Sequence, residues 1–292
     1  MRFLIIIPAH DEEENILLCL ESLQNQTYRD FTVIVVNDGS TDQTKSIVEK
    51  FILQNYRFKL FNLPESEHQP GAKVVHTFNK GLESVAIDDF DVICKFDADI
   101  IFPEDYLMLI NEVYEKNTQA GMVSGIVKIK KNIVVKDLPY DFEDKNEDWV
   151  FENISSKNHV RGPIKSYRKT CFEDMQGLRP ILGWDNIDVM LTQKYGWEVI
   201  TIKSLWVKHL RPTAYKYKSQ KAQKLGEYFY NIGLNLPLAM VSSGKSAFKN
   251  KSISEFIITI KSFLNQNKPR LLSPEEIKYV RRLRWQQMFK KH

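Results

Sequence analysis

Two short acidic signatures in this chain each follow an apolar run directly. Asn37-Asp38-Gly39-Ser40 comes after residues 33–36, and Asp97-Ala98-Asp99 comes after residues 92–96. Each pattern predicts a buried strand that ends in carboxylates. Because ligands of an open α/β sheet bind at the carboxyl ends of its strands, the two signatures predict a site for a polar ligand and a hard cation.

The Asp97 and Asp99 pair suits a divalent cation. Mg²⁺ and Mn²⁺ prefer oxygen ligands and often share them with substrate phosphates. Side chains alternate between the two faces of a strand, so both carboxylates serve one ligand only if the chain bends there, and Pro103 follows closely enough for such a bend. The alternative interpretation is an acidic loop in solvent.

A second acidic pair, Asp185 and Asp188, lies three residues apart at the start of an expected helix. Both side chains would share one helix face, and either could act as a general base. The alternative is that acidic residues simply favour helix N-termini. His209 follows a late strand and lies beside Arg211, where it is either a ligand or a structural histidine.

The pattern of apolar residues predicts the elements that position these groups. Runs rich in β-branched residues alternate with helical patterns of 12 to 15 residues, which indicates βαβ units, a mostly parallel sheet and an α/β fold. Residues 130–160 are polar and irregular, and we expect a loop or lid. The expected strands are 3–7, 31–36, 58–63, 92–96, 122–129, 166–168 and 198–202. The expected helices are 12–26, 41–52, 72–85, 103–117 and 185–195.

Composition and charge limit the classes of protein. The 292 residues allow one large domain, or one domain with an extension. Residues 1–202 hold 22 Lys and Arg against 33 Asp and Glu, whereas residues 203–292 hold 19 against 4. This asymmetry predicts an acidic body with a basic tail that meets an anionic partner. Three cysteines without a CxxC motif indicate reduced thiols and a cytosolic setting.

The basic tail has helical periodicity. Its apolar residues recur at spacings of three and four, which is typical of an amphipathic helix. Such a helix could lie in a membrane interface, or it could pack on the body with its basic face in solvent, and the stripe alone does not separate the two. The stripe consists of Ile253, Phe256, Ile257, Ile260, Phe263 and Leu264.

Taken together, these motifs resemble the family 2 glycosyltransferases with the GT-A fold. The resemblance covers about the first 210 residues and rests on five motifs in the expected order. They are Ile7-Pro8-Ala9-His10-Asp11-Glu12-Glu13, Val35-Val36-Asn37-Asp38-Gly39-Ser40-Thr41-Asp42, Gly71-Ala72-Lys73 with Asn79 and Gly81, Asp97-Ala98-Asp99, and Gly183-Trp184-Asp185 eleven residues before Gly196. It implies a transferase domain over residues 1–210, in which residues 1–100 bind the nucleotide and residues 101–210 bind the acceptor. Residues 211–292 would form a basic helical extension.

The resemblance also implies a role for each matching residue. The donor would be bound by Pro8, His10, Glu12, Asp38, Lys73 and Asp97. The metal would be held by Asp97, Asp99 and His209. The acceptor would be bound by Arg161, Gly162 and Trp184. The base would be Asp185 or Asp188, and the distance to Gly196 favours Asp185. This sequence departs from the family at Trp184, where a glutamate is usual.

The activity implied is that of an inverting, metal-dependent glycosyltransferase that uses Mn²⁺ or Mg²⁺. It would move a sugar from a nucleotide sugar, with UDP favoured over GDP, to a glycan or lipid-linked acceptor in the synthesis of cell-surface polysaccharide or glycolipid. The protein would be cytoplasmic, with its basic tail at an anionic membrane surface on the inner face, and no nucleic-acid partner is expected.

Two other functions stay open from the sequence. One is a non-catalytic protein that binds nucleotide sugars or glycans on the same fold. The other is a nucleotidyltransferase, although such an enzyme would carry a basic glycine-rich loop after the first strand, where this chain has Ala9-His10-Asp11-Glu12. A Rossmann dinucleotide site is disfavoured because no GxGxxG follows that strand.

Overall fold

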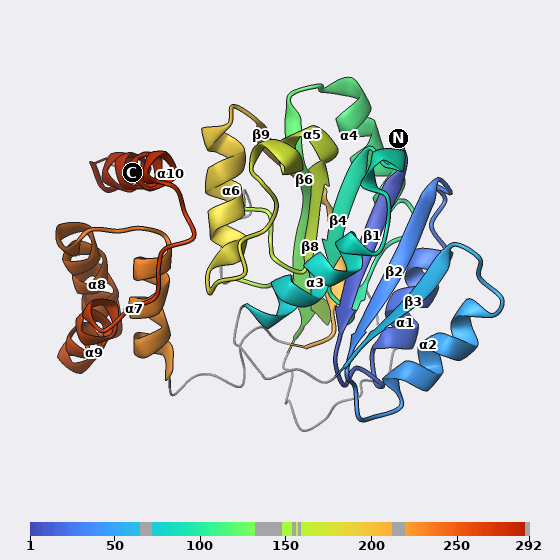
Figure 1. Ribbon diagram of the computed structural model, residues 1–292, viewed down its shortest axis with the longest axis horizontal. Coiled ribbons are helices and arrows are strands. Elements are labelled where there is room, and N and C mark those ends of the chain that lie inside the picture. The colour runs from blue at the N-terminus through green and yellow to red at the C-terminus, as the bar shows by residue number, and fades with distance from the viewer. Residues whose placement is uncertain (65–71, 132–147, 154–155, 157–158, 212–219, 290–292) are drawn as a thin grey trace.

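The computed structural model describes residues 1–64, 72–131, 148–153, 156, 159–211 and 220–289. Over these residues, one sheet of nine strands is flanked by helices on both faces (Figure 1). The strands are β1 (Phe3–Ala9), β2 (Phe31–Asp38), β3 (Phe58–Leu63), β4 (Val92–Phe96), β5 (Ile100–Ile101), β6 (Ala120–Lys130), β7 (Trp149–Phe151), β8 (Ile164–Arg168) and β9 (Glu198–His209). The α-helices of the body are α1 (Ile16–Gln24), α2 (Thr44–Ile52), α3 (Lys73–Glu83), α4 (Tyr106–Lys116), α5 (Lys169–Asp174) and α6 (Trp184–Lys194).

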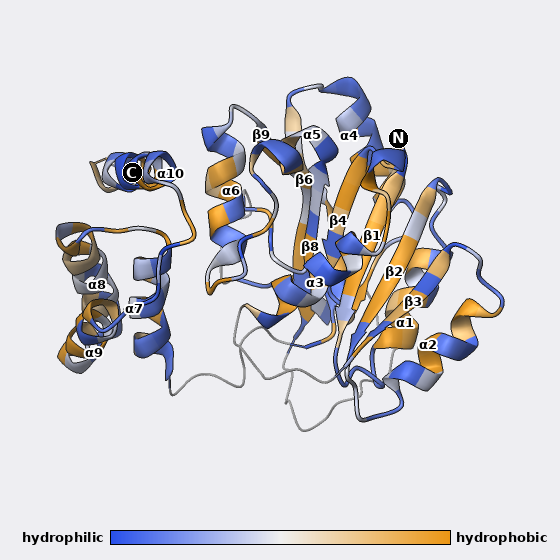
Figure 2. Cartoon of the chain, in the orientation of Figure 1, coloured by the Kyte–Doolittle hydropathy of each residue, from blue (hydrophilic) through white to orange (hydrophobic). Residues whose placement is uncertain are grey.

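The first half of the sheet is parallel, in the order β3-β2-β1-β4. Its strands β1, β2 and β4 are largely apolar on both faces, as their orange colour in Figure 2 shows. Along β1, Ile5 and Ile7 face a core with α1, α2 and α4, whereas Leu4 and Ile6 face a core with α3 and α6. Because both faces are covered, the polar groups of this half gather at the carboxyl ends of the strands.

The second half of the sheet is mixed, and it brings distant segments to the same edge. Strand β8 lies between β4 and β6 and runs antiparallel to both, so that Phe96 pairs with Ile164. Strand β9 runs parallel to β6, and β5 pairs antiparallel with β9, with Ile100 opposite His209. The residues just after β4, just before β8 and at the end of β9 therefore lie close together.

The predicted α/β architecture is confirmed, with two corrections. Within the expected loop 130–160, residues 149–151 form β7 and pair with the end of β6. The prediction was wrong there because β6 extends to Lys130 and its edge groups need a hydrogen-bonding partner. Strand β9 also continues to His209, seven residues beyond the predicted end. The remainder of the expected lid, residues 132–147, lies outside the described residues.

Within residues 220–289, four helices form the C-terminal extension, and they share a hydrophobic core with the body. Asn231 donates a hydrogen bond to the Leu182 carbonyl at 3.1 Å, and Gly183 lies so close to Tyr228 that an added Cβ would approach the ring to 2.3 Å. The division at residue 210 stays a prediction, but the two regions pack against each other. The helices are α7 (Lys221–Asn231), α8 (Leu236–Asn250), α9 (Ile253–Leu264) and α10 (Pro274–Phe289).

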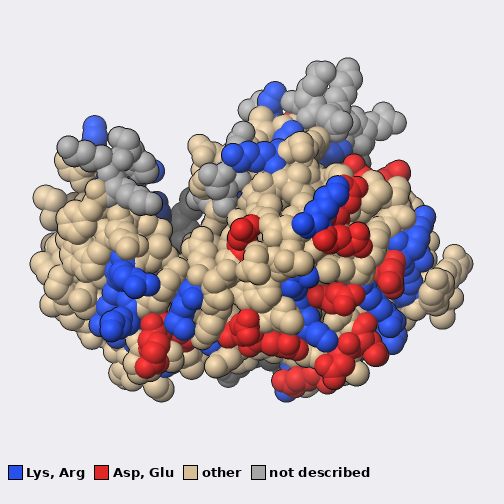
Figure 3. Space-filling model, turned by 90° about the horizontal axis from the view of Figure 1, so that it is seen from above, with Lys and Arg blue, Asp and Glu red and all other residues tan. Residues whose placement is uncertain are grey.

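The charge asymmetry of the sequence is visible on the surface. On the face shown in Figure 3, most acidic side chains lie over the body at the right, and the lobe formed by the extension is largely uncharged or basic. Within the described portion of the chain, no helix combines the length and the hydropathy that crossing a bilayer requires.

Candidate active site

The turn between β4 and β5 holds the Asp97-Ala98-Asp99 motif next to the end of β9. His209 Nε2 lies 3.5 Å from Asp99 Oδ2, and Arg211 Nε donates a hydrogen bond to the same oxygen at 3.0 Å. The backbone closes this corner, because the Leu210 amide donates to the Asp99 carbonyl at 2.9 Å. The register of β5 against β9 thus brings the Asp99 carboxylate to the His209 imidazole and the Arg211 guanidinium, which come more than a hundred residues later in the chain.

Two glutamates complete the corner. Arg211 also donates to Glu12, which follows β1, and so links the Asp99 carboxylate to the donor side of the site. On the other side, Glu152 lies 3.3 Å from His209 Nδ1 and 2.9 Å from Arg161 Nη2. Positive and negative groups therefore alternate through the corner, which is what allows so many charges to be buried together.

Burial and the neighbouring charges shift the pKa values of the groups in this corner. Burial and the nearby Asp99 carboxylate raise the pKa of Glu12 to about 7. Burial opposes the charge on Asp99, but His209 and Arg211 outweigh it and hold the pKa of Asp99 well below its usual range. Burial likewise opposes protonation of His209, but Asp99 and Glu152 raise its pKa to about 10. In the ligand-free protein, His209 is therefore an imidazolium at neutral pH.

Asp97 has different partners from Asp99. Its carboxylate pairs with Lys95, which is buried within β4 and also lies 3.4 Å from the Gly162 carbonyl. Its backbone amide donates to the Pro163 carbonyl at 2.9 Å. The Asp97 side chain stays 30% exposed, so it can still face a ligand. The two carboxylates of the motif thus bracket the site, one toward His209 and one toward Gly162.

Gly162 joins the motif to the helix that carries the predicted base. A Cβ added at Gly162 would lie 3.5 Å from the Cβ of Asp185 and 3.6 Å from Cζ2 of Trp184. The Trp184 ring in turn contacts two buried ammonium groups, with Lys95 at 5.1 Å and Lys165 at 5.7 Å from its centroid. One peptide segment therefore touches both the Lys95–Asp97 pair and the start of α6.

The two aspartates of α6 lie in different environments. Asp188 is 2% exposed, and its oxygens accept hydrogen bonds from Lys165 at 2.8 Å and from the Tyr167 hydroxyl at 2.5 Å. Burial raises the pKa of Asp188, although Lys165 and Tyr167 stabilise its carboxylate. Asp185 is half-buried, and Lys165 contacts its backbone carbonyl at 2.6 Å. Of the two candidates for the base, Asp185 is the one within reach of solvent.

The predicted acceptor residues line the wall behind Asp185. Arg161, Gly162 and Trp184 are all buried in this structure. The guanidinium of Arg161 extends into the protein toward Glu152, at 2.9 Å, rather than toward an open surface. Arg161 therefore supports the Gly162 segment from behind.

The predicted donor residues lie at the ends of β1 and β2. Asp38 ends β2 with its side chain buried, where it accepts a hydrogen bond from Thr77 at 2.9 Å and lies 3.4 Å from Lys73 Nζ. His10 Nδ1 donates to the Asp38 carbonyl at 2.7 Å, and Pro8 lies in β1 beside Val36. These contacts hold the turn after β2 against the turn after β1, as a pocket at that edge requires.

The chemistry of the corner fits a divalent cation. Among the described residues, no three acidic, histidine or cysteine side chains are already arranged as metal ligands. However, Asp99 and His209 lie within one coordination shell of each other, with His209 Nε2 3.5 Å from Asp99 Oδ2. Carboxylate and imidazole are ligands that Mn²⁺ accepts. The Arg211 guanidinium contacts Asp99 Oδ2, an oxygen that it would share with a bound cation.

Four residues of the site were not predicted from the sequence: Lys95, Lys165, Glu152 and His159. The two lysines interrupt strands that are otherwise buried, and a charge in a central strand is a signal that could have identified them. Glu152 is one acidic residue among many between 137 and 152, so nothing distinguished it. Burial and the Lys165 ammonium lower the pKa of His159 to about 4, so this imidazole near Asp185 is neutral at pH 7.

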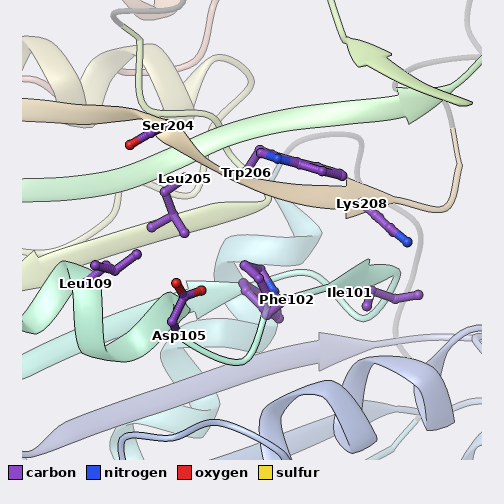
Figure 4. Close-up of a pocket in the computed structure, with 9 residues that line it drawn as sticks. Ile101, Phe102, Asp105, Leu109, Ser204, Leu205, Trp206 and Lys208 are labelled. Atoms are coloured by element: carbon purple, nitrogen blue, oxygen red, sulfur yellow. The ribbon is translucent and has the colours of Figure 1, made fainter. Parts of the chain in front are cut away.

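A hollow of about 440 Å³ lies beside the site and contains none of its predicted residues. Figure 4 shows Trp206 and Lys208 of β9 on one side, and Phe102 and Asp105 on the other. Its lining is mainly apolar, and Asp105 is its one carboxylate. It therefore lacks the ligand set of the corner formed by Asp99 and His209.

A parallel half-sheet with carboxylates at its strand ends, joined to a mixed half-sheet, defines a GT-A fold. The chain belongs to glycosyl transferase family 2, whose family model matches residues 4–174. Among solved structures, the TarS fragment of S. aureus in complex with UDP-GlcNAc is similar, with a TM-score of 0.55 and 16% identity over 100% of this chain and 93% of that one. The mannosyltransferase PcManGT of Pyrobaculum calidifontis, in complex with GDP-Man and Mn²⁺, has a TM-score of 0.57 and 18% identity over 96% of this chain and 72% of that one.

Curated relatives are similar over a portion of their length. The putative glycosyltransferase EpsH of Bacillus subtilis (strain 168) is 34% identical over 169 residues, which cover 58% of this chain and 42% of EpsH. The poly-beta-1,6-N-acetyl-D-glucosamine synthase of Staphylococcus epidermidis is 26% identical over 125 residues, 43% of this chain and 28% of the synthase. The matched segments thus span less than half of the length of these two relatives.

Proposed function

We propose that this protein is an inverting, metal-dependent glycosyltransferase. It moves a sugar from a nucleotide diphosphate to a glycan or lipid-linked acceptor in the synthesis of cell-surface polysaccharide or glycolipid. The observation that carries the proposal is that the Arg161–Pro163 segment contacts both the Lys95–Asp97 pair and Asp185. A candidate metal motif and a candidate base therefore border the same peptide. The similarity to a poly-beta-1,6-N-acetyl-D-glucosamine synthase supports a glycan as the acceptor.

The donor would bind across the ends of β1 and β2. Glu12 and Asp38 would contact the nucleoside, Pro8 and His10 would shape the pocket, and Lys73 would approach the phosphates. The solved complexes of similar fold contain UDP-GlcNAc in TarS and GDP-Man in PcManGT. We favour a UDP-sugar, and a direct comparison of both nucleotides tests the choice.

The metal would be held by Asp99 and His209, and Asp97 would approach the metal or the ribose. The chemistry that Mn²⁺ or Mg²⁺ would supply there is Lewis-acid stabilisation of the charge on the leaving nucleotide diphosphate. His209 must lose its proton to become a ligand, and Arg211 must release Asp99 or share it. Arg211, which joins Asp99 to Glu12, would be available to the negative charge of the donor once released.

Asp185 would be the general base. Its carboxylate would take the proton of the acceptor hydroxyl while the hydroxyl oxygen attacks the anomeric carbon and the bond from that carbon to the diphosphate oxygen breaks. One base of this kind contributes about 100- to 10,000-fold to a rate. Asp188 is less suited because both of its oxygens are bonded to buried donors. Gly162 and Trp184 would form the acceptor wall beside Asp185, and Arg161 would hold that wall in place.

A screen of nucleotide sugars tests this proposal. The wild type is incubated with each UDP- and GDP-sugar and Mn²⁺, and release of the nucleotide is measured alongside variants Asp99→Ala and Asp185→Asn. We expect release from one donor, its loss in Asp99→Ala, and its retention without acceptor in Asp185→Asn. Tight binding of a donor with no turnover, with or without glycan acceptors, would instead indicate a non-catalytic binding protein.

The reaction would take place at an anionic membrane surface on the inner face of the membrane. The 19 basic and 4 acidic residues of 203–292 support this placement, because polybasic segments are attracted to anionic lipids. A lipid-linked acceptor would be presented at the same surface.

A further inference from the structure

The helical hairpin formed by α8 and α9 is held against α7 through one side of α9. Thr259 and Ser262 of α9 donate hydrogen bonds to the Ala222 and Gln223 carbonyls of α7, at 3.1 and 2.7 Å. Gly226 of α7 lies so close to α9 that an added Cβ would come within 2.3 Å of the Thr259 carbonyl. The hairpin is therefore held firmly from one side, and its outer side has a fixed orientation.

The outer side of the hairpin is apolar and exposed. At its turn, Phe248 and Ile253 are 88% and 80% exposed, on either side of a connection made by Lys251 and Ser252. The exposed residues recur at helical spacing along both helices, which indicates one continuous stripe on each. We call these residues the hairpin patch: Leu236, Met240, Val241, Phe248, Ile253, Ile257, Ile258 and Leu264. Single exposed apolar residues are common, but four on each helix of one hairpin indicate an interaction surface.

The predicted amphipathic stripe is thus divided. Phe263 is buried and Phe256 and Ile260 are half-buried, whereas Ile253 and Ile257 are exposed. Packing against the rest of the protein accounts for Phe263, Phe256 and Ile260, but it does not account for the exposed Ile253 and Ile257. In Figures 1 and 2, α8 and α9 lie at the end of the extension away from the sheet and carry orange, hydrophobic segments there.

Lysines surround the hairpin patch. Lys245, Lys249, Lys251 and Lys261 are exposed on the same two helices and their connection. Residues 236–264 contain one acidic residue, Glu255, which accepts a hydrogen bond from Asn250 at 2.8 Å. Of the arginines of α10, Arg281 and Arg284 donate to Gly233 and Tyr228 inside the extension, whereas Arg282 is exposed beside Trp285 and Phe289. The four lysines of the hairpin are the larger group of exposed positive charges next to exposed apolar side chains.

We propose that the hairpin patch inserts into the surface of an anionic lipid bilayer, with Phe248 and Ile253 leading. Apolar side chains of an interfacial helix enter about 5–10 Å into the boundary between headgroups and acyl chains. Lysine side chains keep their ammonium groups at the level of the lipid phosphates while their methylene stems cover apolar surface. A second copy of this chain fits less well, because it would bring the same four lysines against these.

This surface uses none of the residues assigned to donor, metal or acceptor binding. The vesicle-binding experiment and the nucleotide-release assay therefore test separate claims, and either can fail without the other. A protein that binds vesicles but releases no nucleotide would retain the membrane assignment, and a variant that loses vesicle binding should still release nucleotide from a soluble donor at the wild-type rate.

The experiment is co-sedimentation of the full chain with vesicles of phosphatidylcholine alone, or of phosphatidylcholine mixed with phosphatidylglycerol. The test variant is Phe248→Asp with Ile253→Asp. The matched control is Leu53→Asp with Tyr56→Asp, because these residues of the acidic body are 84% and 86% exposed. A second variant, Lys245→Gln with Lys249→Gln, keeps the apolar residues and removes two charges. Circular dichroism verifies that each variant is folded.

We expect the wild type and the control to bind the mixed vesicles and the test variant to bind about tenfold or more weakly. The lysine variant should lose affinity for the mixed vesicles, and higher salt should weaken wild-type binding. Equal binding by the test variant and the wild type would overturn the proposal, as would equal wild-type binding to both kinds of vesicle. Self-association of the wild type that the test variant loses would assign the surface to a second copy instead.

Discussion

Gly162 lies beside Asp185 with room for a methyl group between them, since an added Cβ would lie 3.5 Å from the aspartate Cβ and 3.7 Å from its Oδ2. The same glycine accepts a contact from Lys95, the partner of Asp97. Gly162 thus lies next to both the metal motif and the candidate base, although Asp97, Gly162 and Asp185 are far apart in the sequence.

A large side chain at Gly162 should therefore impair acceptor transfer, whereas a methyl group should be tolerated. Alanine would make ordinary van der Waals contacts with Trp184 and Asp185, so Gly162→Ala should retain most activity. Leucine would displace the Asp185 side chain, and a misplacement of about 1 Å can cost roughly 100-fold in rate. We expect Gly162→Leu to lose acceptor transfer while nucleotide release without acceptor persists. Parallel loss of both, at unchanged stability, would argue against this role.

The Lys165–Asp188 pair should contribute to stability. Removing one partner of a buried ion pair leaves an uncompensated charge and costs about 3–5 kcal/mol, so Lys165→Met should be strongly destabilising. Tyr167→Phe removes one hydrogen bond to Asp188 and should cost about 1–3 kcal/mol. Urea unfolding of each variant measures both values. The double variant Lys165→Met with Asp188→Leu should recover some of the loss, and full additivity would contradict the pairing.

The His209 imidazolium should make the stability of the metal-free protein depend on pH. Its pKa is raised from 6.5 to about 10 in the folded state, so its stabilising effect is complete below pH 6.5. The effect is lost as the pH rises through about 10. We expect the free energy of unfolding to fall over this range in the wild type, and to fall less in His209→Gln. The same slope in both proteins would show that another group is responsible.

Metal removal should abolish turnover of the donor. Treatment with EDTA should stop nucleotide release, and added Mn²⁺ should restore it in the wild type. Asp99→Ala should lower the restored rate by about 100-fold or more, because a carboxylate that would hold the charge-stabilising cation is lost. Glu104→Ala, an exposed acidic residue just after the motif, serves as the control and should behave as the wild type. An Asp99→Ala protein with wild-type response to Mn²⁺ would remove this residue from the metal site.

Much of this arrangement could be predicted from the sequence, and the reasons are local. The strands before Asp38 and Asp97 are apolar runs that end abruptly at polar residues. The pattern of apolar and polar residues therefore predicts the positions of these strands and the sheet edge at which both end. The proximity of His209 to Asp99 did not, because it depends on β5 pairing with β9 in one particular register.

The features that the sequence did not predict depend on packing over long distances. Nothing local distinguishes Asp185 from Asp188, and only the buried Lys165 and Tyr167 separate them. Glu152 acquires its partners His209 and Arg161 because β7 brings its end beside β6. The sequence predicts an amphipathic helix over residues 253–264, but which apolar residues are buried and which are exposed depends on the packing of α7 against α9.

A crystal structure with the preferred nucleoside diphosphate and Mn²⁺ tests the geometry most directly. The metal should lie on Asp99 and His209, with the diphosphate between them and the Gly162 peptide, and with the Asp185 carboxylate facing the same space. A metal held by other residues, or an Asp185 carboxylate well over ~10 Å from the diphosphate with no movement able to close the gap, would contradict the account, since proton transfer needs near hydrogen-bond reach.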